Sequence, residues 1–270
     1  MKTYKRVLTI AGSDSGGGAG IQADIKTISA NGCFATSAIT AITAQNTLGV
    51  TDIHALPISN LKAQIEAVLQ DIGTDSIKIG MLHNAETINA VHQCLKPYKI
   101  KNIVLDPVMV ATSGNKLLQD EAIDTLKNVL IPVSRVITPN IPEAEILLNK
   151  TITKQEELPG LAKALSEKSA GVSVFLKAGH LSDDRLVDVF YNAEKDETIE
   201  LVSQRVHSNN THGTGCTLSS ALAANLAQNI ELTQAAEAAK KYVNEAIIQG
   251  AEYQIGAGHG PVKHFYNLWK

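Results

Sequence analysis

Short apolar runs rich in β-branched residues alternate with longer amphipathic stretches along most of the sequence, and few architectures accommodate that alternation. The apolar runs have the length of buried strands, at residues 7–10, 36–43, 76–79, 103–105, 135–138 and 172–176. The stretches between them carry apolar residues at helical spacing, at residues 61–71, 85–95, 121–130 and 156–168. The pattern predicts an α/β fold in which helices cover a mostly parallel sheet.

The last third of the chain has a different pattern. Residues 186–191 and 198–206 are separated by a polar stretch and predict a small antiparallel hairpin added to the sheet. Helical spacing returns at residues 217–227 and 234–249. No linker rich in Pro, Gly or Ser and no tandem repeat divides the 270 residues, so we expect one domain spanning residues 1–270.

The charge balance excludes two classes of partner. Lys plus Arg number 24 and Asp plus Glu number 27, which gives a formal net charge of −3, and no long run of one sign occurs. We therefore expect neither nucleic acid nor a membrane as a partner. Cys33, Cys94 and Cys216 are too scattered for a disulfide framework, and the apolar run 7–11 is too short for a signal peptide. These features predict a cytoplasmic protein.

The first candidate site is a glycine-rich turn between a predicted strand and a helix. Five glycines fall within the nine residues from Gly12 to Gly20. Glycine permits positive φ and lets a ligand approach the backbone, and a helix N-terminus adds free N–H groups. The run matches neither a P-loop nor a dinucleotide fingerprint. A ligand site and a purely structural turn both remain open.

Asp24 borders an apolar helical stripe formed by Ile21, Ile25 and Ile28, so its carboxylate is expected to face partly inward. A buried carboxylate needs hydrogen-bond partners, because burying it unpaired is costly. A ring nitrogen or amine of a ligand would serve, and so would a backbone N–H or a lysine. The residues alone leave these alternatives open.

The second candidate site is the segment 209–217, which leads into a predicted helix. Backbone N–H groups of Gly213, Thr214, Gly215 and Cys216 would converge at the helix N-terminus, where the helix dipole also favours an anion. The segment therefore predicts an anion hole. Cys216 lies in the first helical turn, where the pKa of a thiol is lowered, and is a candidate base or nucleophile. An inert, packed cysteine is the alternative.

Polar residues follow three of the predicted strands. Asp106 follows one, Asn140 and Glu143 follow the next, and Lys177 follows a third. Ligands of open α/β sheets bind outside the carboxyl ends of the strands, so these side chains are expected to face one crevice. Asp106 and Glu143 suit magnesium, and Lys177 suits a phosphate group. Together they predict a phosphate site.

These motifs together resemble the ribokinase-like kinases, and within them the hydroxymethylpyrimidine and phosphomethylpyrimidine kinases of thiamin biosynthesis. The resemblance covers nearly the whole chain and is carried by residues 12–24, 43–47, 78–82, 106–109, 212–217 and 260–265. Asn140-x-x-Glu143 and Gly213-Thr214-Gly215 are typical of the whole superfamily. The Gly-Ser-Asp start, Gln45-Asn46 and Cys216 narrow the match to this branch.

The resemblance implies an ATP-dependent kinase that uses Mg²⁺, has a three-layer α/β/α ribokinase-like fold and forms a homodimer. Its small-molecule substrate would be 4-amino-5-hydroxymethyl-2-methylpyrimidine, phosphorylated first on the hydroxymethyl group and then from the monophosphate to the diphosphate. The pyrimidine pocket implied in this way is lined by Gly12, Asp24, Gln45, Met81 and Val108. Asp24 and Gln45 would read the polar edge of the ring.

The same resemblance implies roles for the other candidate residues. The catalytic anion hole would comprise Gly213, Thr214, Gly215 and Cys216. Asn140, Glu143 and Lys177 would lie near the ATP phosphates, and Asp106 and Glu143 would hold magnesium.

Cys216 stands where the wider superfamily usually has an aspartate that acts as base. The transition state of phosphoryl transfer is loose, so the nucleophile needs little activation before attack. We hypothesise that Cys216 takes the hydroxyl proton late, and that alignment, magnesium and N–H groups supply most of the acceleration. Three residues depart from the pattern of this branch: Gly16, Ala178 and Thr112. Thr112 replaces an expected lysine, which predicts a weaker second phosphorylation.

Other functions remain as alternatives. The nearest is a pyridoxal kinase of the same superfamily, since pyridoxal is also a small heteroaromatic ring with a hydroxymethyl group. The missing dinucleotide fingerprint disfavours an oxidoreductase. A ligand-binding protein without activity would not need the anion hole and the phosphate site together. A zinc site is disfavoured because further ligands at a recognised spacing are missing and residues 259–261 form a turn sequence. The histidines and cysteine weighed for it were His207, His212 and Cys216, or His259 and His264.

Overall fold

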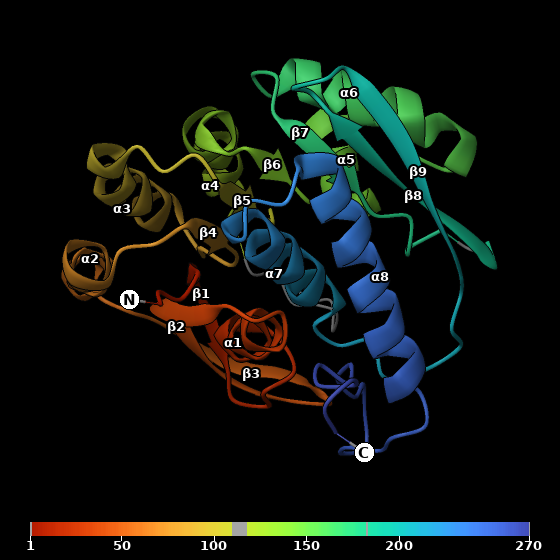
Figure 1. Cartoon of the computed structure of the whole chain (residues 1–270), viewed down its shortest axis with the longest axis horizontal. Coiled ribbons are helices and arrows are strands. Elements are labelled where there is room, and N and C mark those ends of the chain that lie inside the picture. The colour runs from red at the N-terminus through yellow and green to blue at the C-terminus, as the bar shows by residue number, and fades with distance from the viewer. Residues whose placement is uncertain (1, 110–117, 182, 270) are drawn as a thin grey trace.

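The computed structural model describes residues 2–109, 118–181 and 183–269, and these residues form one sheet of nine strands (Figure 1). The order across the sheet is β3-β2-β1-β4-β5-β6-β7-β8-β9. The strands are β1 (Arg6–Asp14), β2 (Phe34–Asn46), β3 (Gly49–Ala55), β4 (Ser76–Ile79), β5 (Ile103–Leu105), β6 (Val136–Ile137), β7 (Ser173–Leu176), β8 (Arg185–Asn192) and β9 (Glu197–Gln204).

The helices of the described residues alternate with these strands through most of the chain. They are α1 (Gly20–Ala30), α2 (Ile58–Ala67), α3 (Ala85–Leu95), α4 (Asp120–Thr125), α5 (Ile141–Leu148), α6 (Leu158–Lys168), α7 (Thr214–Ala227) and α8 (Leu232–Gly250). Single π or 3₁₀ turns extend or connect them: η1 (Val68–Ile72), η2 (Lys96–Tyr98), η3 (Leu126–Leu130), η4 (Ile131–Val133) and η5 (Gln155–Glu157).

The sheet is mostly parallel, as predicted. Strands β2, β1, β4, β5, β6 and β7 are paired in parallel, whereas β8 and β9 form the predicted antiparallel hairpin at one edge. At the other edge β3 pairs antiparallel with β2, which the sequence pattern did not predict. Thr51, Asp52 and His54 of β3 are exposed, so this edge strand lacks the apolar run by which buried strands are recognised.

Side chains of neighbouring residues in one strand point to opposite faces of the sheet, so the core is divided into two layers. Val7 and Val104 pack under α1, α7 and α8, whereas Leu8 and Leu105 belong to the layer under helices α2 to α6. Figure 1 shows these two groups of helices on opposite sides of the sheet. The three-layer α/β/α architecture expected from the resemblance is therefore confirmed.

The parallel strands bring the candidate site together. The carboxyl ends of the parallel strands lie at one end of the sheet. The N-termini of α1, α5 and α7 face the same region as the segments that follow β1, β4, β5, β6 and β7. Helix α5 begins with a capping box: Asn140 accepts from the N–H of Glu143, and Glu143 accepts from the N–H of Asn140. None of the helices in the described residues has the length and apolar character needed to cross a membrane.

Candidate active site

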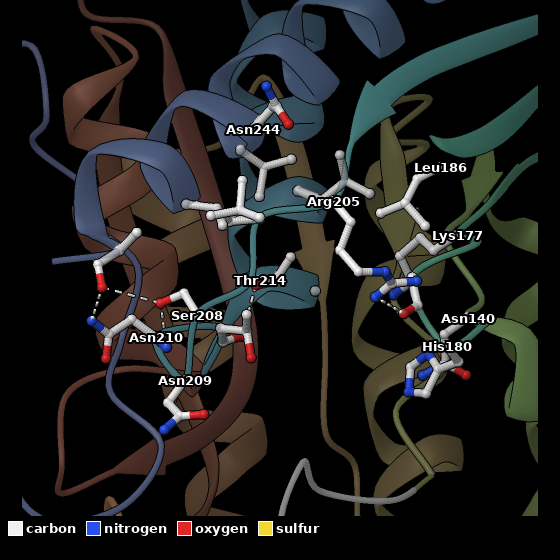
Figure 2. Close-up of a pocket in the computed structure, with 18 of the residues that line it drawn as sticks. Asn140, Lys177, His180, Leu186, Arg205, Ser208, Asn209, Asn210, Thr214 and Asn244 are labelled. Atoms are coloured by element: carbon white, nitrogen blue, oxygen red, sulfur yellow. Dashed lines mark hydrogen bonds between the residues drawn. The ribbon is translucent and has the colours of Figure 1, made fainter. Parts of the chain in front are cut away.

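Two cavities open at the carboxyl ends of the parallel strands and meet at shared residues. The larger, of about 1260 Å³, lies between β8–β9, the segment leading to α7, and α8 (Figure 2). The smaller, of about 150 Å³, lies among the ends of β1, β2, β4 and β5 and the start of α7. Both are lined by Asn140, Glu143, Lys177 and Gly215. A ligand in one cavity would therefore meet a ligand in the other at these four residues.

The loop before α7 requires glycine at position 213. Gly213 has a φ of 80° and caps α7, and a Cβ atom there would collide with the backbone oxygen of Gly18. The N–H groups of Gly215 and Cys216 lie in the first turn, where an α-helix offers no intrahelical acceptor. The N–H of Thr214 differs, because it already donates to the oxygen of Thr211 at 3.2 Å. The predicted anion hole therefore has fewer free donors than the four expected, because the N–H of Thr214 is already used.

The three strand ends converge as predicted. Asp106 Oδ1 accepts from Lys177 Nζ and from Thr138 Oγ1, each at 3.1 Å. Burial alone would lower the pKa of Lys177, but the Asp106 and Glu143 carboxylates outweigh it and raise the pKa, so the ammonium group stays charged. Burial raises the pKa of Glu143 to about 7, although Lys177 opposes the shift. In this cluster the two carboxylates of Asp106 and Glu143 thus share one ammonium group, that of Lys177.

Cys216 lines the smaller cavity, but its acidity differs from the prediction. Burial raises the pKa of the Cys216 thiol to about 11, and the positive charge of Lys78 only partly offsets that. The prediction of a lowered pKa was therefore wrong: loss of hydration outweighs the helix N-terminus. In the structure Cys216 is a neutral thiol at pH 7.

Asp24 does not line either cavity. It is fully buried beneath the smaller one, where Lys78 Nζ lies 2.8 Å from its Oδ1 atom. Thr9 Oγ1 donates to its Oδ2 atom at 2.6 Å, and Ser220 Oγ donates to Oδ1 at 2.8 Å. The prediction that Asp24 reads the substrate is thus not met, because its carboxylate is satisfied within the protein. Lys78 is the lysine partner that the residues alone left open.

The other residues predicted for the ring pocket line the smaller cavity: Gly12, Gln45, Met81 and Val108. A Cβ atom at Gly12 would come 3.2 Å from Met81 Cε, so glycine leaves room for the methionine side chain. Lys78, Asp14 and His212 line the same cavity and were not among the predicted site residues. A lysine within the buried strand Ser76–Ile79 was the one visible sign of a buried ion pair.

The glycine-rich turn is folded around Asp14. The Asp14 carboxylate accepts the N–H groups of Gly16 at 2.7 Å, Gly18 at 3.0 Å and Ala19 at 2.8 Å. These N–H groups are therefore used within the turn and are not offered to a ligand. Of the departures from the family pattern, Ala178 is buried and donates its N–H to Asp188, whereas Thr112 lies outside the described residues.

Comparisons with known proteins agree with this geometry. The sequence model of the family described as phosphomethylpyrimidine kinase matches residues 14–263. A hydroxymethylpyrimidine/phosphomethylpyrimidine kinase of Rhizobium meliloti is 45% identical over 97% of this chain and 98% of its own length. The crystal structure of phosphomethylpyrimidine kinase from Clostridium difficile is 42% identical, covers 90% of this chain and 99% of that one, and superposes with a TM-score of 0.79.

A pyridoxal kinase from Staphylococcus aureus, solved in complex with ADP, is also similar. It is 31% identical, covers 99% of this chain and 96% of that one, and gives a TM-score of 0.89. The fold is thus the ribokinase-like fold that the sequence motifs implied. The family match spans most of the sequence, and the identity to the pyrimidine kinase exceeds that to the pyridoxal kinase. This chain belongs to the phosphomethylpyrimidine kinase family.

Proposed function

We propose that this chain transfers a phosphoryl group from ATP to the hydroxymethyl group of 4-amino-5-hydroxymethyl-2-methylpyrimidine, and then a second one to the monophosphate. One observation carries the proposal: a large and a small cavity meet at Asn140, Glu143, Lys177 and Gly215. A phosphotransferase needs two substrates that face each other across one reaction point. The names of relatives that match nearly the whole chain support this choice of substrate.

The larger cavity would bind ATP. Figure 2 shows Lys177, Asn140 and His180 gathered at one side of it, next to Arg205. The ammonium group of Lys177 neutralises phosphate charge there, and the N–H groups of Gly215 and Cys216 bind phosphate oxygens at the start of α7. The ADP complex of the Staphylococcus aureus pyridoxal kinase supports this use of a nucleotide.

Asp106 and Glu143 would hold Mg²⁺. The raised pKa of Glu143 supports this, because a buried carboxylate with too little positive charge around it gains from a divalent cation. Magnesium commonly uses one or two protein carboxylates and keeps several waters. When bound, Mg²⁺ supplies charge neutralisation at the phosphates. Lys177 and the anion loop align the phosphates independently of the metal.

The smaller cavity would bind the pyrimidine ring. Met81 and Val108 supply apolar contacts, Gly12 leaves space, and the amide of Gln45 offers one donor and one acceptor to the polar edge of the ring. Cys216 lines this cavity at the start of α7 and would take the proton of the substrate hydroxyl. Because the thiol is neutral at pH 7 in the free protein, this role requires the thiolate, which forms as the pH rises.

We also propose that residues 1–270 act as one cytoplasmic domain that forms a homodimer. The free thiols of all three cysteines support a reducing compartment. Ile42 on β2 is 48% exposed and Leu48, in the β2–β3 turn, is 71% exposed, which supplies apolar surface for a second copy. Light scattering on Ile42→Glu tests this, since a dimer held at that edge would dissociate and one held elsewhere would not.

Steady-state ADP release tests the kinase proposal. The protein is assayed with Mg²⁺ and ATP on the hydroxymethylpyrimidine, on its monophosphate and on pyridoxal. We expect turnover of both pyrimidines, with kcat/KM for pyridoxal well below either. Turnover of pyridoxal alone would assign Gln45 and Met81 to a different ring, and absence of turnover with every acceptor would leave a binding protein.

A further inference from the structure

The His212 ring lies between Asp14 and the Gln45 amide at the wall of the smaller cavity. Its Nε2 atom is 2.9 Å from Asp14 Oδ2 and 3.3 Å from the nearest amide atom of Gln45, assigned as Nε2. The other end of that amide is 3.1 Å from Thr43 Oγ1. Gln45 thus has one hydrogen-bonding neighbour at each end of its amide, and those neighbours determine which end is oxygen.

The first step concerns the proton on the ring. Burial alone would raise the pKa of Asp14, but hydrogen bonds from His212 and from the N–H groups of Ala19 and Gly16 outweigh it and lower the pKa. Asp14 is therefore an ionised acceptor at neutral pH. A nitrogen 2.9 Å from that carboxylate carries a hydrogen, whether the ring is neutral or charged. His212 Nε2 is a donor.

The second step concerns the amide. An NH₂ group of Gln45 facing His212 would find no acceptor on the protonated nitrogen. The single hydrogen on His212 Nε2 goes to Asp14 at 2.9 Å, and an amide oxygen of Gln45 at 3.3 Å accepts the longer arm of the same, shared hydrogen bond. The NH₂ group then faces Thr43 Oγ1, whose own hydrogen goes to the oxygen of Ser13 at 2.9 Å. All these groups are satisfied in that one orientation. The oxygen and nitrogen of Gln45 therefore have a fixed order along the cavity wall.

His212 and Gln45 are both held in place by the surrounding structure. A Cβ atom at Gly18 would collide with the His212 ring, and the backbone N–H of His212 donates to Gly260 at 3.0 Å. The backbone of Gln45 is held by Ser15, whose hydroxyl donates to its oxygen at 2.7 Å and accepts from its N–H at 2.8 Å. The amide is held at the backbone and at both polar atoms.

We propose that the Asp14–His212 pair is the specificity-determining device of the smaller cavity, because it fixes the orientation in which Gln45 reads the substrate ring. With the order fixed, the amide pairs with an exocyclic amine beside a ring nitrogen that accepts. A ring with an oxo group beside an N–H presents the reverse order and is rejected. The inference rests on the proposed function, and it assigns to His212 a positioning role that acts through Gln45.

The test compares two substrates that differ in that edge: the 4-amino pyrimidine alcohol and its 4-oxo counterpart, with the same hydroxymethyl group. We measure kcat/KM for both with the wild type, His212→Ala and Thr43→Val. The wild type is expected to favour the amine by at least about 100-fold. Each variant frees one end of the amide and should reduce the ratio by about tenfold, roughly one hydrogen bond, with the change mainly in KM.

Ser15→Ala is the matched control, because it loosens the backbone of Gln45 and leaves both amide neighbours in place. It is expected to lower kcat/KM for the two substrates alike, with the ratio unchanged. Thr43→Val keeps the shape of the buried side chain, so it answers the question even if His212→Ala unfolds. An unchanged ratio in Thr43→Val and in folded His212→Ala would overturn the inference while leaving the kinase intact. Wild-type protein inactive on the amine would instead reject the proposed function.

Discussion

Cys216→Ala removes the thiol that is proposed to accept the proton of the substrate hydroxyl. Burial raises the pKa of the Cys216 thiol to about 11, roughly four units above neutral pH. At pH 7 about one molecule in 10⁴ then carries the thiolate, and this fraction grows about tenfold with each pH unit. If the thiolate is the base, the rate of phosphoryl transfer follows that fraction.

The assay is ADP release at saturating Mg²⁺, ATP and pyrimidine alcohol, from pH 7.5 to 9.5. The wild-type kcat is expected to rise about tenfold per pH unit over this range, because the thiolate remains the minor form. Cys216→Ala should have a flat profile and a kcat at pH 9 that is lower by about 10²–10⁴-fold. Cys216→Ser should behave like the alanine variant, since a hydroxyl is less acidic than a thiol.

Cys94→Ala is the matched control, since Cys94 is a free cysteine that is buried in α3, outside both cavities. Its profile should coincide with that of the wild type. Melting temperatures at each pH establish that the variants are folded. A wild-type rate that does not change between pH 7.5 and 9.5, or a rise that survives in Cys216→Ala, would refute the role of the thiolate.

Three further changes test other parts of the site. Lys78→Met leaves Asp24 buried without its counter-charge and should lower the free energy of unfolding by about 3–5 kcal/mol in urea titrations; wild-type stability would contradict the ion-pair assignment. Burial raises the pKa of Glu143 to about 7, so a carboxylate that holds Mg²⁺ is lost as pH falls below 7. Below pH 7 wild-type activity should therefore fall more steeply than the tenfold per pH unit caused by Cys216, whereas Glu143→Gln should have low activity and keep only the tenfold slope; the same steeper slope in both proteins would exclude Glu143. Gly213→Ala forces a Cβ atom into Gly18 and should raise KM for ATP at least about tenfold, because the anion loop must shift. Gly171→Ala, at a φ of 75° in open space, should leave that KM unchanged; equal effects would contradict the argument.

The periodic elements could be predicted from the sequence because their signals are local. Helix α3 coincides with the predicted stretch 85–95, where apolar spacing follows an Asn84 cap that accepts from the N–H of Thr87. The edge strand β3 carries no such signal, because its exposed residues are polar and it depends on β2 for its hydrogen bonds. Such a segment becomes a strand only through its pairing with a neighbour in the folded protein.

The site could be predicted as far as it depends on strand ends. Asp106, Glu143 and Lys177 meet because parallel strands end together, which the order of elements already implies. The partner of Asp24 could not be predicted, since Lys78 lies on a different element and the pairing is set by packing. The acidity of Cys216 was predicted with the wrong sign, because the helix N-terminus is a local feature whereas burial results from the whole fold.

The central claim is phosphoryl transfer between the two cavities, and phosphorus NMR of one reaction tests it most directly. Protein, Mg²⁺, ATP and the 4-amino pyrimidine alcohol are mixed, and the spectrum is followed with time. We predict the resonance of a phosphomonoester of the alcohol, then those of its diphosphate, while ADP accumulates. ADP that appears only together with inorganic phosphate, without any ester of the pyrimidine, would contradict the claim.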